Sequence, residues 1–114
     1  LRVDPIVPVD NWRLVYRELL ESIDFTPSRI TLGSLRAKPT LLRLRSEDGW
    51  TRYLSEDSKW GRRPDRYVRA GMYAYLVSYI EDHIGCPVAL CKETIEQWNE
   101  LGFDYRKIQC NCVP

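Results

Sequence analysis

The run from Arg29 to Arg36 constrains the fold more than any other stretch, because an apolar centre leads directly into a polar end. It follows the turn signal Pro27-Ser28 and contains β-branched and apolar residues, a pattern typical of a short buried strand. The run then passes through Gly33-Ser34, where a backbone can approach a ligand closely. α/β proteins build their sites at polar strand ends of this kind. We therefore expect a buried strand over residues 29–35 with a site at its end.

Residues 1–8 form a second strand-like run, although its two prolines cannot donate to a sheet and limit how much of it pairs. Between the two runs, the sequence predicts a helix over residues 11–23, capped by Asp10. Its apolar residues recur with helical spacing: Trp12, Val15, Tyr16, Leu19 and Ile23. A strand, a helix and a strand joined by short links predict a right-handed parallel crossover. We therefore expect an α/β fold in which the strands 1–8 and 29–35 are parallel neighbours.

The remainder of the chain is predicted to form a mostly helical cover on this unit. The expected elements are a short helix over 39–45, a weak strand over 50–54, a loop or hairpin over 55–64, a long buried helix over 65–84, a short strand over 87–90, a helix over 93–101 and an irregular tail. Gly85 and Gly102 are expected to end the last two helices. In the final helix, we expect Ile95, Trp98 and Leu101 to point inward. The chain thus divides into a β-α-β unit over 1–37 and a helical, cysteine-containing region over 38–114.

The length of 114 residues suits a single domain. The longest apolar run, Tyr73–Ile80, is too short to span a bilayer, so we expect no membrane partner. The first residues do not form a charged region followed by a long apolar one, which favours a cytoplasmic location. Because Leu1 already lies inside a strand-like run, we expect this chain to be a piece of a longer protein.

Positive charge is concentrated in the middle of the chain. Between Arg29 and Arg69 there are eleven Lys and Arg residues and five Asp and Glu residues, although the whole chain has a net charge of only +1. The aromatic residues Trp50, Tyr53, Trp60 and Tyr67 lie among them. Arginine with aromatic side chains suits a phosphate backbone and stacked bases. The alternative is an ordinary solvated basic face, which the near-neutral net charge favours.

The four cysteines are the candidate metal ligands. Their even number allows disulfides, but no secretion signal supports that reading. Cys110 and Cys112 are too close in sequence for a relaxed disulfide with each other. Their two thiolates can instead bind one metal ion or cluster. Cys91, at a strand end before a helix, is a third candidate ligand and Cys86 a less certain fourth. The spacing matches no standard zinc signature, so reduced, partly buried thiols remain the alternative.

The order of these parts resembles the C-terminal portion of spore photoproduct lyase and its radical S-adenosylmethionine (SAM) relatives. The matching segments are Arg2-Val3-Asp4-Pro5-Ile6, the helix from Trp12 to Leu20, the run from Arg29 to Arg36, Lys59-Trp60-Gly61-Arg62, the long Tyr-rich helix and Pro87-Val88-Ala89-Leu90-Cys91-Lys92-Glu93. The resemblance implies the C-terminal part of a partial (β/α) barrel. Strands 1–8 and 29–35 would be its last two strands, and residues from Lys38 onward would form its cover.

In that family, a Cys-x3-Cys-x2-Cys loop holds a 4Fe–4S cluster, which cleaves S-adenosylmethionine to a radical. This sequence contains no such motif, so the resemblance implies part of a lyase-type DNA-repair enzyme that lacks its cluster segment. The partner would be the missing N-terminal part. We expect the chain alone to contribute substrate binding, with DNA as the implied substrate, and to have no lyase activity.

The resemblance also implies site residues. Asp4 and Ser34, at the strand ends, would face the cofactor, and Arg36 would face the substrate. Lys59, Trp60 and Arg62 lie where the lyase presents a hairpin to damaged DNA, so the cations would hold phosphates while the indole stacks on a base. The family's glycine-rich continuation is replaced here by Arg63-Pro64-Asp65, and ordinary loop polarity is the alternative reading.

Two further function classes remain open. The basic, aromatic middle would suit a stand-alone nucleic-acid-binding module without chemistry. The cysteines at positions 91, 110 and 112 would suit a small protein that binds a metal ion or an iron–sulfur cluster.

Overall fold

The structure is a computed structural model that describes residues 1–38 and 52–103. The predicted helix over 39–45, Trp50 of the weak strand, and the ligand candidates Cys110 and Cys112 lie outside the described residues. Arg52 and Tyr53, which belong to the weak strand predicted over 50–54, form a helical turn. The strand prediction is therefore wrong for these two residues.

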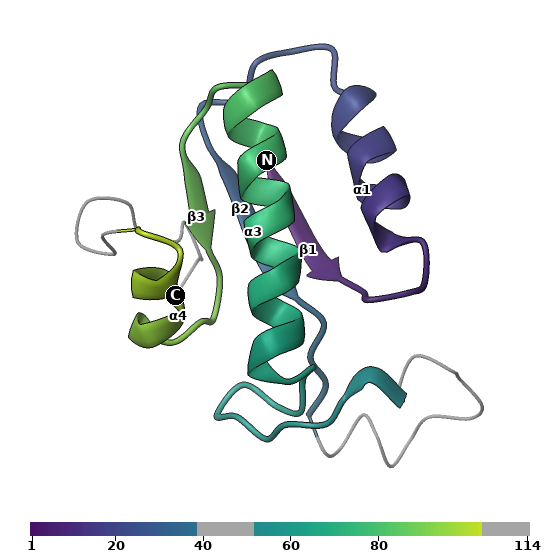
Figure 1. The fold of residues 1–114 in the computed structure, drawn as a ribbon, viewed down its shortest axis with the longest axis vertical. Coiled ribbons are helices and arrows are strands. Elements are labelled where there is room, and N and C mark those ends of the chain that lie inside the picture. Colours follow the sequence, from purple (N-terminus) through teal and green to yellow (C-terminus); the bar gives the residue numbers. More distant parts are fainter. Residues whose placement is uncertain (39–51, 104–114) are drawn as a thin grey trace.

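Three parallel strands form the sheet: β1 (Arg2–Ile6), β2 (Ile30–Ser34) and β3 (Val88–Leu90), in the order β1-β2-β3 (Figure 1). Val3 pairs with Leu32, which pairs with Leu90 on its other side. The predicted parallel pairing of the first two strands is therefore confirmed. All five residues of β2 are buried, as expected for an apolar central strand.

In residues 1–38 and 52–103, the helices that accompany the sheet are α1 (Trp12–Glu21), α3 (Arg66–His83) and α4 (Ile95–Glu100). Figure 1 shows α3 lying across the sheet with α1 beside it, and these two helices contact each other. α1 lies between β1 and β2 in the chain and α3 lies between β2 and β3, so both helices run back against the parallel strands that they connect. As a result, α3 begins at the carboxyl ends of the strands and ends near their amino ends.

The ends of the helices follow local capping chemistry, with one exception. The Asp65 carboxylate caps α3 by accepting from the backbone N–H groups of Tyr67 and Val68 at 2.9 and 3.0 Å. Gly85 and Gly102 have φ values of 79° and 77°, and they end α3 and α4 as predicted. The prediction that Asp10 caps α1 is wrong, because the cap position is Asn11, which makes no side-chain cap hydrogen bond.

The core lies between the sheet and the two long helices. Its fully buried side chains come from alternate strand positions and from one side of α3: Ile6, Ile30, Leu32, Met72, Tyr73, Leu76, Ile80 and Leu90. In α4, Trp98 joins this core, whereas Ile95 is 50% exposed and the prediction that it points inward is wrong. No helix in the described part of the chain is long and apolar enough to cross a bilayer.

Gly33 marks a point of close packing between β1 and β2. A Cβ atom built at Gly33 would lie 2.6 Å from Cγ of Asp4. Asp4 and Gly33 therefore share the sheet face opposite the one that carries the core residues Val3 and Leu32. A side chain at Gly33 would displace the Asp4 carboxylate.

We predict that Gly33→Ala lowers the free energy of unfolding by about 1–3 kcal/mol through this overlap. The matched control is Gly71→Ala in α3, because nothing lies within 4 Å of a Cβ at Gly71. The control should raise stability by about 0.5–1 kcal/mol, since glycine is unfavourable inside a helix. Urea unfolding of both variants measures these changes, and equal effects would contradict the packing argument.

Candidate functional site

The carboxyl ends of the three strands bring together polar side chains that are far apart in the sequence. Asp4 lies on β1, Arg36 follows β2, and Cys91 follows β3. Nη2 of Arg2 lies 2.9 Å from Sγ of Cys91, so this hydrogen bond joins β1 to the end of β3 across the central strand. The Asp4 carboxylate occupies the space that a side chain at Gly33 would fill on this face of β2.

Asp4 and Arg36 form a two-point ion pair at the strand ends. Nη1 and Nη2 of Arg36 donate to the two carboxylate oxygens of Asp4 at 3.0 and 3.2 Å. Burial lowers the pKa of Arg36, but the hydrogen bond and charge of Asp4 outweigh burial and raise that pKa. Arg2 also contacts Asp4, at 3.4 Å. Two guanidinium groups therefore surround one carboxylate, which leaves a net positive charge able to attract an anionic group.

Ser34 lies on the other side of the sheet from Asp4. Its side chain lies on the same face of β2 as those of Ile30 and Leu32, which enter the core, and it is 4% exposed. Its hydroxyl is near the phenol of Tyr73 on α3. The structure thus brings Asp4 and Arg36 together but places Ser34 under α3.

Beneath α3, four charged side chains form what we call the buried ion network: Glu56, Arg63, Arg69 and Glu93. The Glu93 carboxylate is completely buried and accepts from Nε of Arg69 and from the Tyr73 hydroxyl, both at 2.8 Å. Nη1 of Arg69 reaches Glu56 at 2.5 Å, and Nε of Arg63 reaches the same carboxylate at 3.1 Å. Two carboxylates and two guanidinium groups make the network electrically neutral.

The sequence did not reveal this network, because its members are distant along the chain. In the sequence, Arg63 and Arg69 belong to a basic segment that suggests a charged surface. In the structure, their side chains are 6% and 2% exposed. The available signal was Glu93, a carboxylate placed directly after a buried strand. Burial and the negative charge of Glu93 raise the pKa of the Tyr73 phenol, which therefore stays protonated and donates its hydrogen bond.

Lys59, Trp60 and Arg62 lie in a loop that is attached to the end of β2. The backbones of Arg62 and Ala37 pair through hydrogen bonds of 2.8 and 2.9 Å, which brings this loop close to Arg36. Nζ of Lys59 lies 4.7 Å from the centre of the Trp60 indole. Arg62 contacts the backbone oxygen of Leu54 and the carboxylate of Asp57.

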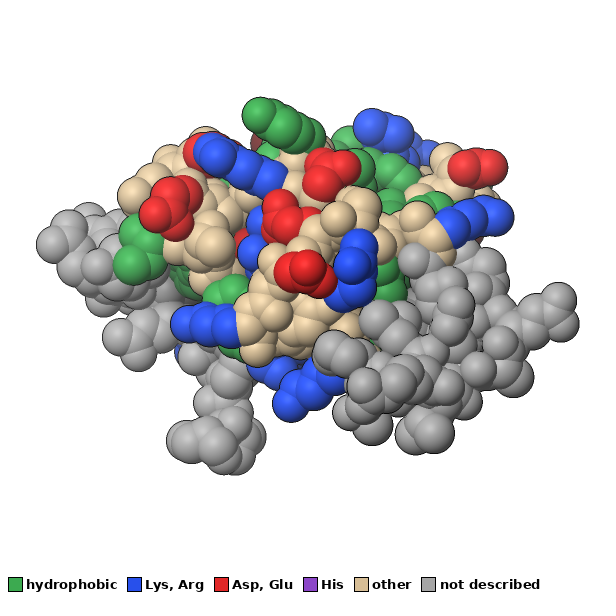
Figure 2. All heavy atoms as spheres, turned by 90° about the horizontal axis from the view of Figure 1, so that it is seen from below, with side chains coloured by type: hydrophobic (Ala, Val, Ile, Leu, Met, Phe, Trp, Pro, Cys, Tyr) green, Lys and Arg blue, Asp and Glu red, His purple; other side chains and the backbone are tan. Residues whose placement is uncertain are grey.

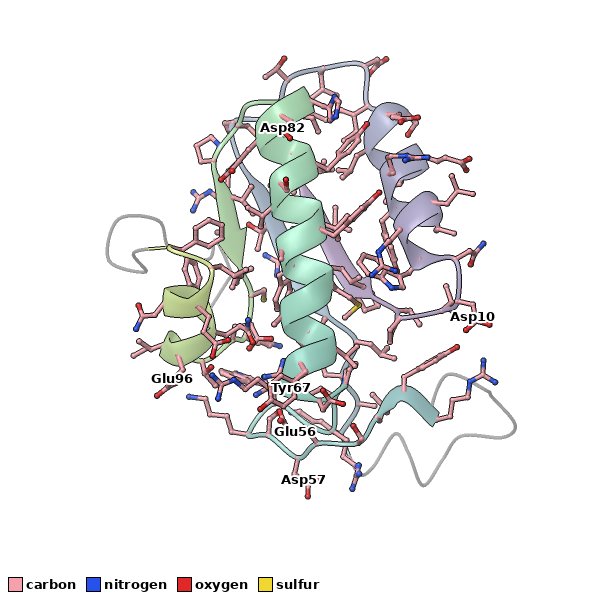
Figure 3. All side chains as sticks on the ribbon, in the orientation of Figure 1. Asp10, Glu56, Asp57, Tyr67, Asp82 and Glu96 are labelled. Atoms are coloured by element: carbon pink, nitrogen blue, oxygen red, sulfur yellow. The ribbon has the colours of Figure 1, made fainter. Side chains whose placement is uncertain are left out.

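The surface at the strand carboxyl ends carries both signs of charge. Figure 2 shows carboxylates at the centre of this face with Lys and Arg side chains around them. Figure 3 places Glu56 and Tyr67 beside the first turn of α3, with Asp57 farther out in the loop below. The basic segment of the sequence therefore does not produce a uniformly basic face in the described part of the chain.

The structure describes two of the four cysteines, and both are buried. They lie at opposite ends of β3, since Cys86 precedes this strand and Cys91 follows it. Burial raises the pKa of the Cys86 thiol. Within residues 1–38 and 52–103, no three potential metal-ligating side chains come together, and the proposed set with Cys110 and Cys112 lies partly outside this range.

No family model, curated protein or solved structure matches this chain.

The buried ion network predicts how stability depends on pH. Burial alone would raise the pKa of Glu56, but the hydrogen bonds and charges of Arg69 and Arg63 lower it below its ordinary value of 4.5. A carboxyl group with a lowered folded-state pKa stabilises the fold while it is ionised. Stability from this group should therefore be complete above pH 4.5 and fall as the pH drops through the lower folded-state value.

We predict that Glu56→Gln reduces this acid-dependent loss and lowers stability at neutral pH. Asp57→Asn is the matched control, because the neighbouring Asp57 side chain is 84% exposed and its ion pair is worth little. Urea unfolding at several pH values between about 3 and 7 measures both variants against the parent chain. The same acid dependence in Glu56→Gln and in the parent would contradict the role assigned to Glu56.

Proposed function

We propose that this chain is the closing part of a larger radical SAM enzyme similar to spore photoproduct lyase, in which it binds substrate. The observation that carries the proposal is the parallel sheet, whose strand order follows the sequence and whose polar groups gather at the carboxyl ends of the strands. (β/α) barrels place their sites at this end of their strands, with helices on the outside of the sheet. Because β3 extends the same parallel sheet, β1, β2 and β3 would be the last three strands of such a partial barrel, and not β1 and β2 alone as the sequence predicts.

In this proposal, Arg36 and Asp4 are the groups nearest to the chemistry. The guanidinium of Arg36 is held by two hydrogen bonds to Asp4 and is fixed at the strand end. It suits a phosphate or carboxylate of the substrate or cofactor, because a guanidinium group can donate to two oxygens of either anion. Asp4 fixes the direction in which that guanidinium points.

The cluster chemistry would belong to another part of the enzyme. The sequence has no Cys-x3-Cys-x2-Cys motif, and so its own residues do not fit the 4Fe–4S cluster that cleaves S-adenosylmethionine. The contribution of this chain would be to orient bound groups at the strand ends. An auxiliary metal or cluster at Cys91, Cys110 and Cys112 remains a separate prediction.

Binding of nucleic acid without chemistry is the second candidate function. The loop that carries Lys59, Trp60 and Arg62 supports it, because an indole between cations suits stacking on a base and contact with a phosphate. The carboxylates on the same face favour single-stranded or distorted DNA over a long duplex, since they would repel an extended phosphate backbone.

The radical SAM proposal predicts where the missing chemistry is encoded. The complete coding sequence should carry a Cys-x3-Cys-x2-Cys motif upstream of Leu1. After anaerobic reconstitution with iron and sulfide, the complete protein should cleave S-adenosylmethionine, and residues 1–114 should not. Cleavage by residues 1–114, or a complete coding sequence without the motif, would overturn the proposal.

The DNA assignment makes a prediction of its own. Lys59→Glu should weaken binding of a single-stranded oligonucleotide and reduce its salt dependence by about one ion contact. Trp60→Ala should cost about 1–3 kcal/mol of binding through lost stacking. Arg13→Glu is the charge-matched control, because Arg13 belongs to α1 and not to the loop, and its guanidinium stacks on Trp12. Fluorescence anisotropy at low and high salt measures all three, and equal losses in Lys59→Glu and Arg13→Glu would reject the loop as the binding surface.

A further inference from the structure

A groove lies between α1 and α3 at the end of the molecule opposite the strand carboxyl ends. It consists of two adjoining cavities of about 390 and 680 Å³, and both are lined by Glu21, Tyr79 and His83. Figure 3 shows Asp82, another lining residue, at the far end of α3 from Glu56. The groove is therefore separate from the site described above.

The groove carries a net negative charge, and the two helix ends beside it make negative charge unfavourable there. Three carboxylates line it, from Glu21, Asp24 and Asp82, against the single guanidinium of Arg17. Both α1 and α3 end here, and a helix carries partial negative charge at its C-terminus. The last turn of α1 contains no basic residue. Because carboxylates and two negative helix ends repel one another, a bound cation would stabilise this region.

Aromatic rings form the other part of the lining. Tyr75, Tyr79, His83 and Phe25 contribute, and Phe25 is 59% exposed. The exposed ring of Phe25 can attract a cation with its face, whereas the Tyr79 ring lies against the His83 ring, with the ring centres 4.4 Å apart. The chain already uses this attraction nearby, since the guanidinium carbon of Arg13 lies 4.5 Å from the centre of the Trp12 ring and 5.8 Å from that of Tyr75.

Glu21 is held in position at the centre of the groove. Its carboxylate accepts a hydrogen bond of 3.2 Å from the Tyr79 hydroxyl and lies 3.7 Å from Nε of Arg17. Asp24 lies in one cavity and Asp82 in the other, with Glu21 shared between them. The carboxylates are therefore distributed along the groove instead of converging on one point.

We propose that this groove binds a small linear organic cation with two or more ammonium groups, of the polyamine class. The distributed carboxylates match charges spaced along an aliphatic chain, and the aromatic rings match its methylene groups and cationic ends. A single divalent metal ion is a poorer match, because no three ligating side chains come together in the described residues. Each of the two cavities has a volume in the range of small-molecule sites.

Isothermal titration of residues 1–114 with spermidine tests the proposal. Glu21→Gln and Asp82→Asn should each weaken binding about threefold or more, because each removes one carboxylate from the groove. Glu81→Gln and Glu18→Gln are the matched controls: they remove the same charge from the same two helices, and neither residue lines the groove. The controls should change the affinity less than 1.5-fold or so.

A second titration separates a shaped site from a merely acidic surface. Magnesium chloride at equal ionic strength should bind more weakly than spermidine, and Tyr79→Phe should weaken spermidine binding by releasing Glu21. Circular dichroism of each variant confirms that it is folded. Equal losses in groove and control variants, equal binding of magnesium, or no heat of binding at low salt would each overturn the proposal. None of these outcomes bears on the proposed function, because the groove lies at the other end of the sheet.

Discussion

The Glu93 carboxylate, enclosed by Arg69 and Tyr73, is the interaction on which the strand ends depend. Glu93 follows β3, Arg69 and Tyr73 lie on α3, and Arg69 continues to Glu56 in the loop before that helix. Removing one partner of a buried ion pair costs about 3–5 kcal/mol, because a charge is left in an apolar environment without compensation. The network therefore fixes the relative positions of three segments around the carboxyl ends of the sheet. Arg36 and the loop that pairs with Ala37 are attached to these fixed segments.

The same network changes the meaning of the basic stretch in the sequence. Arg63 and Arg69 contribute to the local excess of positive charge, yet the structure buries both against Glu56 and Glu93. One of these carboxylates lies outside the stretch, so a count of charges along the sequence could not include it. Lys59 and Arg62 are the cations of the loop that remain near the surface. Within the described residues, binding of phosphate at this loop would rest on a few side chains and not on a broad basic surface.

Features that depend on nearby residues could be predicted from the sequence. The apolar run at β2 and the helical spacing of apolar residues in α1 and α3 predicted the β-α-β unit and the long helix. Features set by distant contacts could not. Asp10 precedes a helix but Asn11 occupies the cap position, and Ile95 has helical spacing but lies on the exposed side of a short helix. Asp4 and Arg36 were both expected at strand ends, whereas their pairing depends on the register between β1 and β2.

The two ends of this sheet differ in electrostatic character, and the topology contributes to the difference. Parallel strands require crossover helices that run back against them, so helix N-termini lie at the strand carboxyl ends and helix C-termini lie at the strand amino ends. The first end, where α3 begins, presents Arg2 and Arg36 around one carboxylate and suits an anion. The second end, where α1 and α3 stop, presents Glu21, Asp24 and Asp82 and suits a cation. At the second end, the carboxylates extend the negative polarity of the helix ends, whereas at the first end the Asp65 cap and the carboxylates of the buried ion network offset the positive polarity at the start of α3.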